Sequence, residues 1–174
     1  MNLLAKENIV SIPKVKLQFR VDLEPLVDWD VSVFILGEDN KVVSEDYFVY
    51  YNNTKSPDGA VWLYSDRYEY ENDPEFIGLD LGEISTEAVE LIVVFSAYNY
   101  QYHDKKHLTY PRLSFELLDL LTTQSFFKHV YGDNFSSCAS IELCRIYKDD
   151  GEWKIQATGV GHRGGLEELV NKFM

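Results

Sequence analysis

The sequence has few of the features that mark secreted, membrane-spanning or nucleic-acid-binding proteins. Its 174 residues include two cysteines, and 16 lysines and arginines stand against 29 aspartates and glutamates, a formal charge of 16 − 29 = −13. No run approaches the roughly 18 apolar residues of a membrane span, and residues 1–7 lack a signal peptide's basic start and apolar middle. The negative charge would repel phosphate backbones. We therefore expect a cytoplasmic protein with no transmembrane segment and no affinity for nucleic acid.

The two cysteines, Cys138 and Cys144, fall in one expected strand. Six residues along a strand span about 20 Å, whereas a disulfide needs alpha carbons within roughly 7 Å. We therefore expect two buried thiols in a reducing compartment.

The length and the 45% hydrophobic content suit a single domain over residues 1–174. Short runs rich in aromatic and β-branched residues alternate with polar turns, which is typical of strands. The runs are 15–22, 31–36, 46–51, 77–81, 90–97, 113–118, 139–147 and 153–158, and the expected turns are 37–41, 55–59 and 148–152. Residues 113–121 also fit helical spacing, but we interpret their first part as a strand. The pattern predicts a sandwich of two antiparallel sheets.

One helix is expected at the end of the chain. Leu166, Leu169, Val170 and Phe173 fall at i, i+3, i+4 and i+7 after two glycines. This spacing predicts a short amphipathic C-terminal helix.

Asp28 and Asp30 stand at the start of an apolar run. On an extended chain, residues two apart point to the same side, so these carboxylates would repel one another unless a cation neutralised them. Calcium takes six to eight oxygen ligands and tolerates irregular geometry. The alternative is a pair of solvated turn aspartates on a surface that is acidic for solubility.

A second acidic segment, residues 65–75, contains Asp66, Asp73 and Glu75. It lacks the ligand spacing and the fixed glycine of an EF-hand, so any ion would be held by residues from separate loops. A solvated charged loop is the alternative.

No motif argues for an enzyme. Residues 159–164 spell Gly-x-Gly-x-x-Gly, but the chain ends too soon for a dinucleotide-binding unit, and we interpret these glycines as a turn and a helix entry. His103 and His107 have zinc-like spacing in a polar loop without the zincin glutamate. The sequence has no Gly-x-Ser-x-Gly elbow, and neither cysteine has a nearby histidine.

Several blocks together resemble the TerD-like domains of the tellurium-resistance stress proteins. The blocks are 28–37, 46–53, 55–61, 145–148, 151–154, 159–161 and 164–166, so the resemblance extends over nearly the whole chain from about residue 15. It implies a β-sandwich that binds calcium in loops at one end of its sheets and serves in stress response, including tellurite resistance. The implied ligands are Asp28 and Asp30, supported by Asn52, Asp66, Asp73 and Glu75.

The resemblance also implies a mode of action. We expect a non-enzymatic scaffold or ligand-binding domain whose partners are other stress-response proteins of the tellurium-resistance system. The alternative is a metal-assisted hydrolase that uses the same loop-bound ion.

The chain departs from the family in the acidic segment. That loop is usually rich in glycine, but here Tyr68, Glu69 and Tyr70 occupy the glycine-rich part and Pro74 replaces an acidic residue. Tyrosine resists left-handed conformations and proline fixes its own φ, so fewer oxygens should converge. We expect one calcium ion or none, in place of the two that a typical member can hold.

Overall fold

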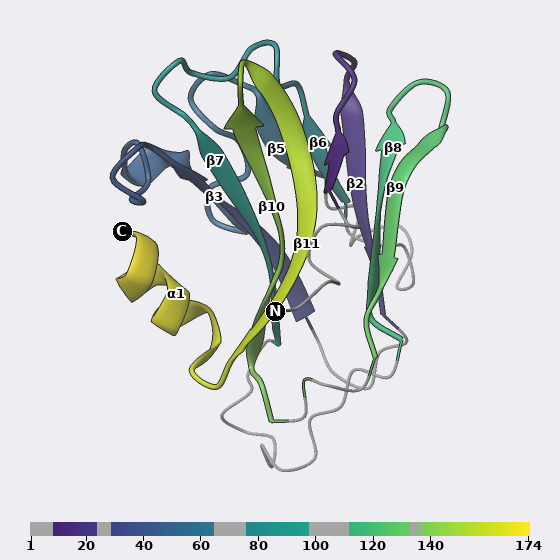
Figure 1. Ribbon diagram of the computed structural model, residues 1–174. Coiled ribbons are helices and arrows are strands. Elements are labelled where there is room, and N and C mark those ends of the chain that lie inside the picture. Colours follow the sequence, from purple (N-terminus) through teal and green to yellow (C-terminus); the bar gives the residue numbers. More distant parts are fainter. Residues whose placement is uncertain (1–8, 24–28, 65–75, 98–111, 133–134, 136) are drawn as a thin grey trace.

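A computed structural model describes residues 9–23, 29–64, 76–97, 112–132, 135 and 137–174 (Figure 1). Two antiparallel sheets face each other across the core. The elements are β1 (Ile9–Ser11), β2 (Leu17–Asp22), β3 (Trp29–Leu36), β4 (Phe48–Val49), β5 (Val61–Tyr64), β6 (Phe76–Leu79), β7 (Glu90–Ala97), β8 (Ser114–Asp119), β9 (Ser125–Val130), β10 (Ser140–Asp149), β11 (Glu152–His162) and α1 (Gly165–Phe173). The predicted sandwich with one C-terminal helix is confirmed.

The strand order defines two sheets and two ends. Sheet A has the order β1-β11-β10-β7-β3-β4, and sheet B has the order β5-β6-β2-β8-β9. We call the end where β3 and β10 begin and β7 and β11 finish the lower end, as it is drawn in Figure 1. The upper end carries the β10–β11 hairpin, where Asp150 (φ 51°) and Gly151 (φ 76°) adopt the left-handed conformations that a tight two-residue hairpin turn needs.

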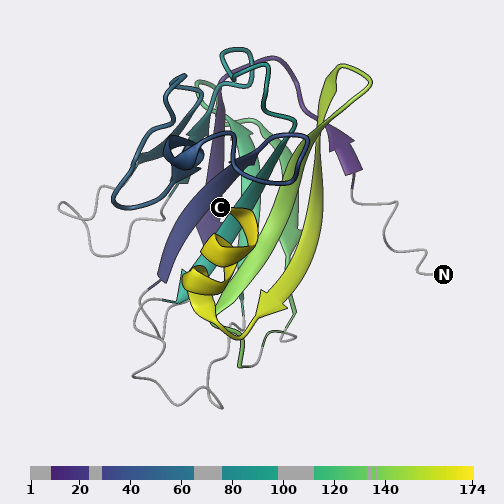
Figure 2. The same ribbon diagram turned by 90° about the vertical axis from the view of Figure 1, so that its left-hand side faces the viewer.

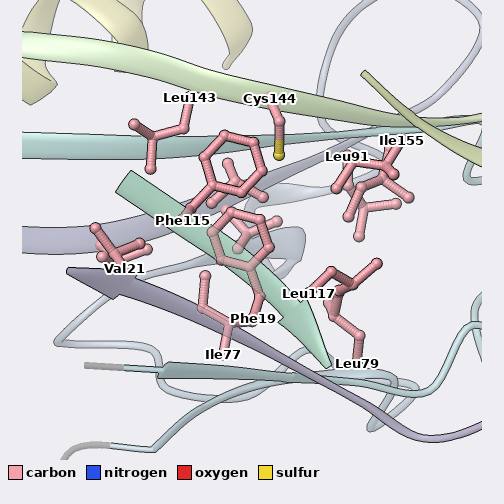
Figure 3. Close-up of a cluster of buried hydrophobic side chains, with 14 of the residues drawn as sticks. Phe19, Val21, Ile77, Leu79, Leu91, Phe115, Leu117, Leu143, Cys144 and Ile155 are labelled. Atoms are coloured by element: carbon pink, nitrogen blue, oxygen red, sulfur yellow. The ribbon is translucent and has the colours of Figure 1, made fainter. Parts of the chain in front are cut away.

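The core lies between the sheets and follows from strand alternation. Phe19 on β2 and Phe115 on β8 are buried, and their rings stack with centroids 4.9 Å apart (Figure 3). Facing them from sheet A are Leu143, Cys144 and Ile155, all fully buried. The Cys144 thiol is enclosed by this apolar core, and burial raises its pKa.

A second, smaller core lies on the outer face of sheet A, where α1 packs (Figure 2). Leu169 and Phe173 of α1 share this core with Phe34, and the rings of Phe34 and Phe173 lie 5.0 Å apart. The main-chain N–H of Val42 donates to the Phe173 carbonyl at 2.9 Å, so the turn after β3 caps the end of the helix. The periodicity that predicted the helix is therefore the pattern of its buried face.

Most of the expected strands are present with shifted ends, and β7 has its expected limits. The expected strand 46–51 is shorter, because residues Glu45–Tyr47 form a 3-10 helix and a turn follows at Tyr50–Asn53. β1, β5 and β9 were not predicted, since each is short or has weak alternation. Neither cysteine forms a disulfide, and Cys144 is buried as expected. Cys138 differs from the expectation, because it is only partly buried and precedes β10.

The interpretation of residues 159–164 as a turn and a helix entry is partly wrong. Gly159 and Gly161 lie within β11, and only Gly164 stands at the helix entry. A Cβ on Gly159 would lie 2.8 Å from the Tyr131 ring, and one on Gly161 would lie 2.5 Å from the Cys138 sulfur. These two glycines are therefore required by close packing against the strand.

Candidate functional site

Polar side chains line the lower end of the outer face of sheet A. Antiparallel pairing places Asp30 opposite Ser96, Ser96 opposite Ser140, and Ser140 opposite His162. We call these four residues the polar row. Trp29 and Val31 pack into the core, so Asp30, which lies between them, points outward. The predicted ligand Asp30 therefore shares one face with two buried serines and a histidine.

The next positions on the same face are also partly polar. Ser32 and Glu142 both pair with Val94, from the two sides of β7. Both are buried, and the Ser32 hydroxyl has no hydrogen-bond partner among the described residues. One step higher the face becomes apolar, with Phe34 and Ile92 beneath α1. The outer face is thus polar at its lower end and apolar where β3, β4 and β7 lie beneath α1.

A charged cluster joins the polar lower end to α1. One oxygen of Glu142 accepts from Lys172 Nζ at 2.6 Å and lies 2.9 Å from His162 Nε2. The other ring nitrogen of His162 lies 3.2 Å from Glu168 Oε1, so the imidazole bridges two carboxylates. The Gly164 N–H and then His162 lower the pKa of Glu168. Burial of the Glu142 carboxylate is compensated because it has cationic and imidazole partners.

Ser140 gives the cluster a further link. Its hydroxyl donates to the Gly165 carbonyl at 3.1 Å, at the first turn of α1. The helix is therefore held by hydrogen bonds at its start and by an ion pair from Lys172 near its end.

An irregularity in β10 orients this polar end. Pairing with β7 shifts between Glu142 and Cys144, so Leu143 and Cys144 both reach the core while Glu142 stays outside. Tyr131, which follows β9, spans the sandwich and donates from its hydroxyl to the Leu143 carbonyl. Burial raises the pKa of Tyr131, although hydrogen bonds from the main chain of Gly159 and Thr158 act in the opposite direction. The tyrosine thus satisfies polar main-chain groups that the bulge leaves unpaired.

Asn52 lies in the turn that follows β4. Val49 pairs with Val33, and extending that register would bring Asn52 opposite Asp30. The chain instead turns back at Tyr50–Asn53. The neighbouring Asn53 side chain fixes this turn by donating to the Phe48 carbonyl at 2.7 Å and to the Asp46 carbonyl at 3.0 Å. Asn52 itself is exposed.

The structure places two of the six predicted ligands. Asp28, Asp66, Asp73 and Glu75 lie outside the described residues, as do His103 and His107. Among the residues that the structure describes, no three histidine, cysteine, aspartate or glutamate side chains lie close enough together to hold a metal ion. Asp30 and Asn52 offer oxygen donors, which suit calcium, but a complete site requires ligands from the remaining segments.

A carboxylate at the upper end has a different environment. Asp58, in the expected turn 55–59, accepts from the Ser56 hydroxyl at 2.6 Å and the Ala60 N–H at 2.9 Å. Its second oxygen accepts from the Ser85 N–H at 2.8 Å. Burial raises the pKa of Asp58, but these hydrogen bonds outweigh it and hold the pKa below its usual value. The Asp58 carboxylate therefore links its own turn to residue 85 through hydrogen bonds.

Comparison with known proteins places the chain in a family. The sequence pattern of the TerD domain matches residues 2–173. The chain belongs to the TerD domain family. It is 28% identical over 151 residues to the tellurium resistance protein TerD of Serratia marcescens, covering 84% of this chain and 77% of that protein. It is 23% identical over 148 residues to general stress protein 16U of Bacillus subtilis (strain 168), with the same coverage.

A solved structure has the same fold. The crystal structure of a homologue of the telluride resistance protein TerD from Streptomyces coelicolor A3(2) superposes with a TM-score of 0.68 at 13% identity. The match covers 91% of this chain and 96% of that one. In the described part of the TerD-domain chain, no helix is long and apolar enough to cross a membrane.

Proposed function

We propose that this TerD-domain protein is a calcium-binding stress-response module that acts as a non-enzymatic scaffold or ligand-binding domain. Relatives named for tellurium resistance and for general stress support the stress role. The position of Asp30 carries the calcium proposal, because its carboxylate points outward at the end of a buried strand. Asp28 and Asp30 would hold the ion, with Asn52, Asp66, Asp73 and Glu75 in support.

Calcium would supply charge neutralisation at this site. On a chain of formal charge −13, convergent carboxylates repel one another until a cation binds. The ordered loops would then present a surface to other stress-response proteins. Because of the altered acidic segment, we propose one ion per TerD domain and not two.

Two described groups support a binding role in preference to hydrolysis. A catalytic histidine must have a nitrogen free to accept a proton from a nucleophile or water, but both ring nitrogens of His162 face carboxylates. The hydroxyl opposite it on the next strand, that of Ser140, is already donated to the helix. Neither residue is arranged as a nucleophile and base pair.

Thermal unfolding in excess chelator and in millimolar calcium tests the proposal. A ligand that binds only the native state stabilises it by RT ln(1 + [L]/Kd), about 2.7 kcal/mol at a hundredfold excess over Kd. Asp28→Asn or Asp30→Asn should weaken the calcium response. Asp150→Asn makes the same charge change in the exposed upper hairpin and should leave it intact, as should His103→Ala. An unchanged melting temperature in the unmodified protein would refute calcium binding.

A further inference from the structure

The outer face of sheet B has no covering element among the described helices and strands, in contrast to sheet A with α1 (Figure 1). Phe19 and Leu117 point into the core, so their neighbours Arg20 and Glu116 point to this outer face. Large apolar side chains are exposed on the same sheet, with Tyr64 at 50% and Val130 at 61%. Exposed apolar groups on a sheet face indicate an interaction surface when they gather with suitable polar groups.

One row of directly paired residues crosses this face from edge to edge. In order, it consists of Tyr64, Phe76, Arg20, Glu116 and Lys128. Positive, negative and positive side chains therefore alternate over β2, β8 and β9. Asp22 also points outward, from the end of β2. The outer face of sheet B therefore carries two basic side chains, Arg20 and Lys128, and two acidic side chains, Glu116 and Asp22. Such local balance contrasts with the formal charge of −13 for the whole chain.

The aromatic side of the row is rigidly packed. The Tyr64 and Phe76 rings stack with centroids 4.5 Å apart and 14° between their planes. Beside them, the Trp62 indole lies over Gly78, where a Cβ would come within 1.9 Å of the ring. Tryptophan, tyrosine and arginine are the residue types that contribute most at protein interfaces. Rings that are already fixed lose little conformational freedom when a partner binds.

Arg20 lacks a carboxylate partner within the described part of the chain. Its Nε is buried without a hydrogen bond, and its Nη2 makes one long contact of 3.5 Å with the Gln18 side chain. Glu116 is paired with it in register but forms no ion pair with it. A guanidinium in this setting gains most from a carboxylate supplied by a second molecule.

We propose that the outer face of sheet B mediates self-association of this protein as a twofold dimer. A twofold axis along the strands between β2 and β8 brings Arg20 of each copy opposite Glu116 of the other, twice in one interface. Two copies of so acidic a protein repel one another elsewhere, and this face combines balanced charge with aromatic groups. A second copy fits it better than a uniformly charged partner, because the row presents both signs.

Sedimentation velocity over a wide concentration range tests the proposal with charge-reversal variants. Arg20→Glu alone places two pairs of facing glutamates in the interface, and Glu116→Arg alone places two pairs of facing arginines there. Each should weaken dimerisation at least about tenfold, since like charges across an interface oppose association. An equimolar mixture of the two variants should restore the dimer. In each heterodimer, the introduced glutamate at position 20 of one copy faces the introduced arginine at position 116 of the other. The second contact keeps the native pair of Arg20 and Glu116.

Controls separate this outcome from changes in folding or net charge. Lys14→Glu and Glu38→Arg make similar charge changes at exposed upper-end positions and should leave the dimer unaffected. Melting temperatures of all variants check that the fold is kept, and Tyr64→Ala gives an uncharged probe of the same face. A wild-type protein that stays monomeric at its highest soluble concentration would overturn the proposal. Variants that remain dimeric alone, or a mixture that fails to restore the dimer, would overturn it as well.

Discussion

The two ends of the sandwich carry carboxylates in two different settings. At the upper end, Asp58 accepts three hydrogen bonds from its own turn and from residue 85, and Asp119 accepts from the N–H groups of Leu121 and Thr122. At the lower end, Asp30 points outward in a row with buried serines, beside a cluster that ties Glu142 to α1. Acidic residues therefore shape turns at one end and form a polar surface at the other.

The role of an acidic side chain in this fold therefore depends on its spatial neighbours and not on its sequence context. A turn aspartate surrounded by N–H donors has no need of a cation. An outward aspartate at the end of a buried strand, on a polar face, is placed where a cation can reach it. Substitutions at each end should therefore have different consequences for stability and for the response to calcium.

Tyr131→Phe should have the largest effect on the lower end. The change leaves the Leu143 carbonyl, which the tyrosine hydroxyl contacts, buried and unpaired beside the main chain of the bulge. An unsatisfied buried group costs about 1 to 3 kcal/mol, and we expect a loss near the top of that range. Urea unfolding measures the loss, and His129→Phe provides a control at the ring that packs on Tyr131. A loss below about 0.5 kcal/mol would show that the bulge does not depend on the hydroxyl.

Asp58→Ala should destabilise the upper end by about 2 kcal/mol, because hydrogen bonds to a charged acceptor are worth about 1.5 to 3 kcal/mol. The loss should be the same with chelator and with calcium, since this carboxylate serves the turn. Chemical unfolding under both conditions measures it. A calcium-dependent loss would remove the distinction between the two ends.

The pH dependence of stability should also report on Asp58. Because the folded-state pKa is lowered, the contribution of this carboxylate is present above the unfolded pKa of about 3.9 and is lost as pH falls through the lower folded value. Asp58→Asn should therefore flatten the acid limb of the stability curve relative to the unmodified protein. Urea midpoints measured from neutral to strongly acidic pH provide the comparison, and parallel curves would contradict the prediction.

Glu142→Gln should have the smallest effect, about 1 kcal/mol, because glutamine keeps the shape and loses only the charge opposite Lys172 and His162. The effect should be local to α1. Hydrogen exchange should show faster exchange in residues 166–173 while β2 and β8 keep their protection. Glu167→Gln, at an exposed position of the same helix, is the matched control. Equal changes in both variants would mean that the cluster does not hold the helix.

Much of the fold could be predicted because alternation and turn chemistry are local signals. β7 and α1 follow directly from their apolar periods, and the β10–β11 hairpin follows from Asp150 and Gly151. β1 and β5 were missed because short strands become regular only when they pair. The bulge at Leu143 could not be predicted either. The residue that hydrogen-bonds to it, Tyr131, is distant in sequence and reaches it from across the sandwich.

The candidate site was predictable only in part. Asp30 points outward because it alternates with Val31 on β3, whereas the expected common side with Asp28 lies outside the described residues. Its neighbours Ser96, Ser140 and His162 could not be found from sequence, because sheet pairing brings them together from three strands. Asn52 was expected to support Asp30 through the family resemblance, but the chain turns back at Tyr50–Asn53 and Asn52 does not pair with that residue.

We propose that calcium binds at the Asp30 end of the sandwich. Isothermal titration of the chelator-treated, dialysed protein with calcium tests it most directly. We predict one ion per chain for the unmodified protein, a strongly weakened isotherm for Asp30→Asn, and an unchanged isotherm for Asp150→Asn. Absence of binding heat at several temperatures, or equal binding by the unmodified protein and Asp30→Asn, would contradict the account.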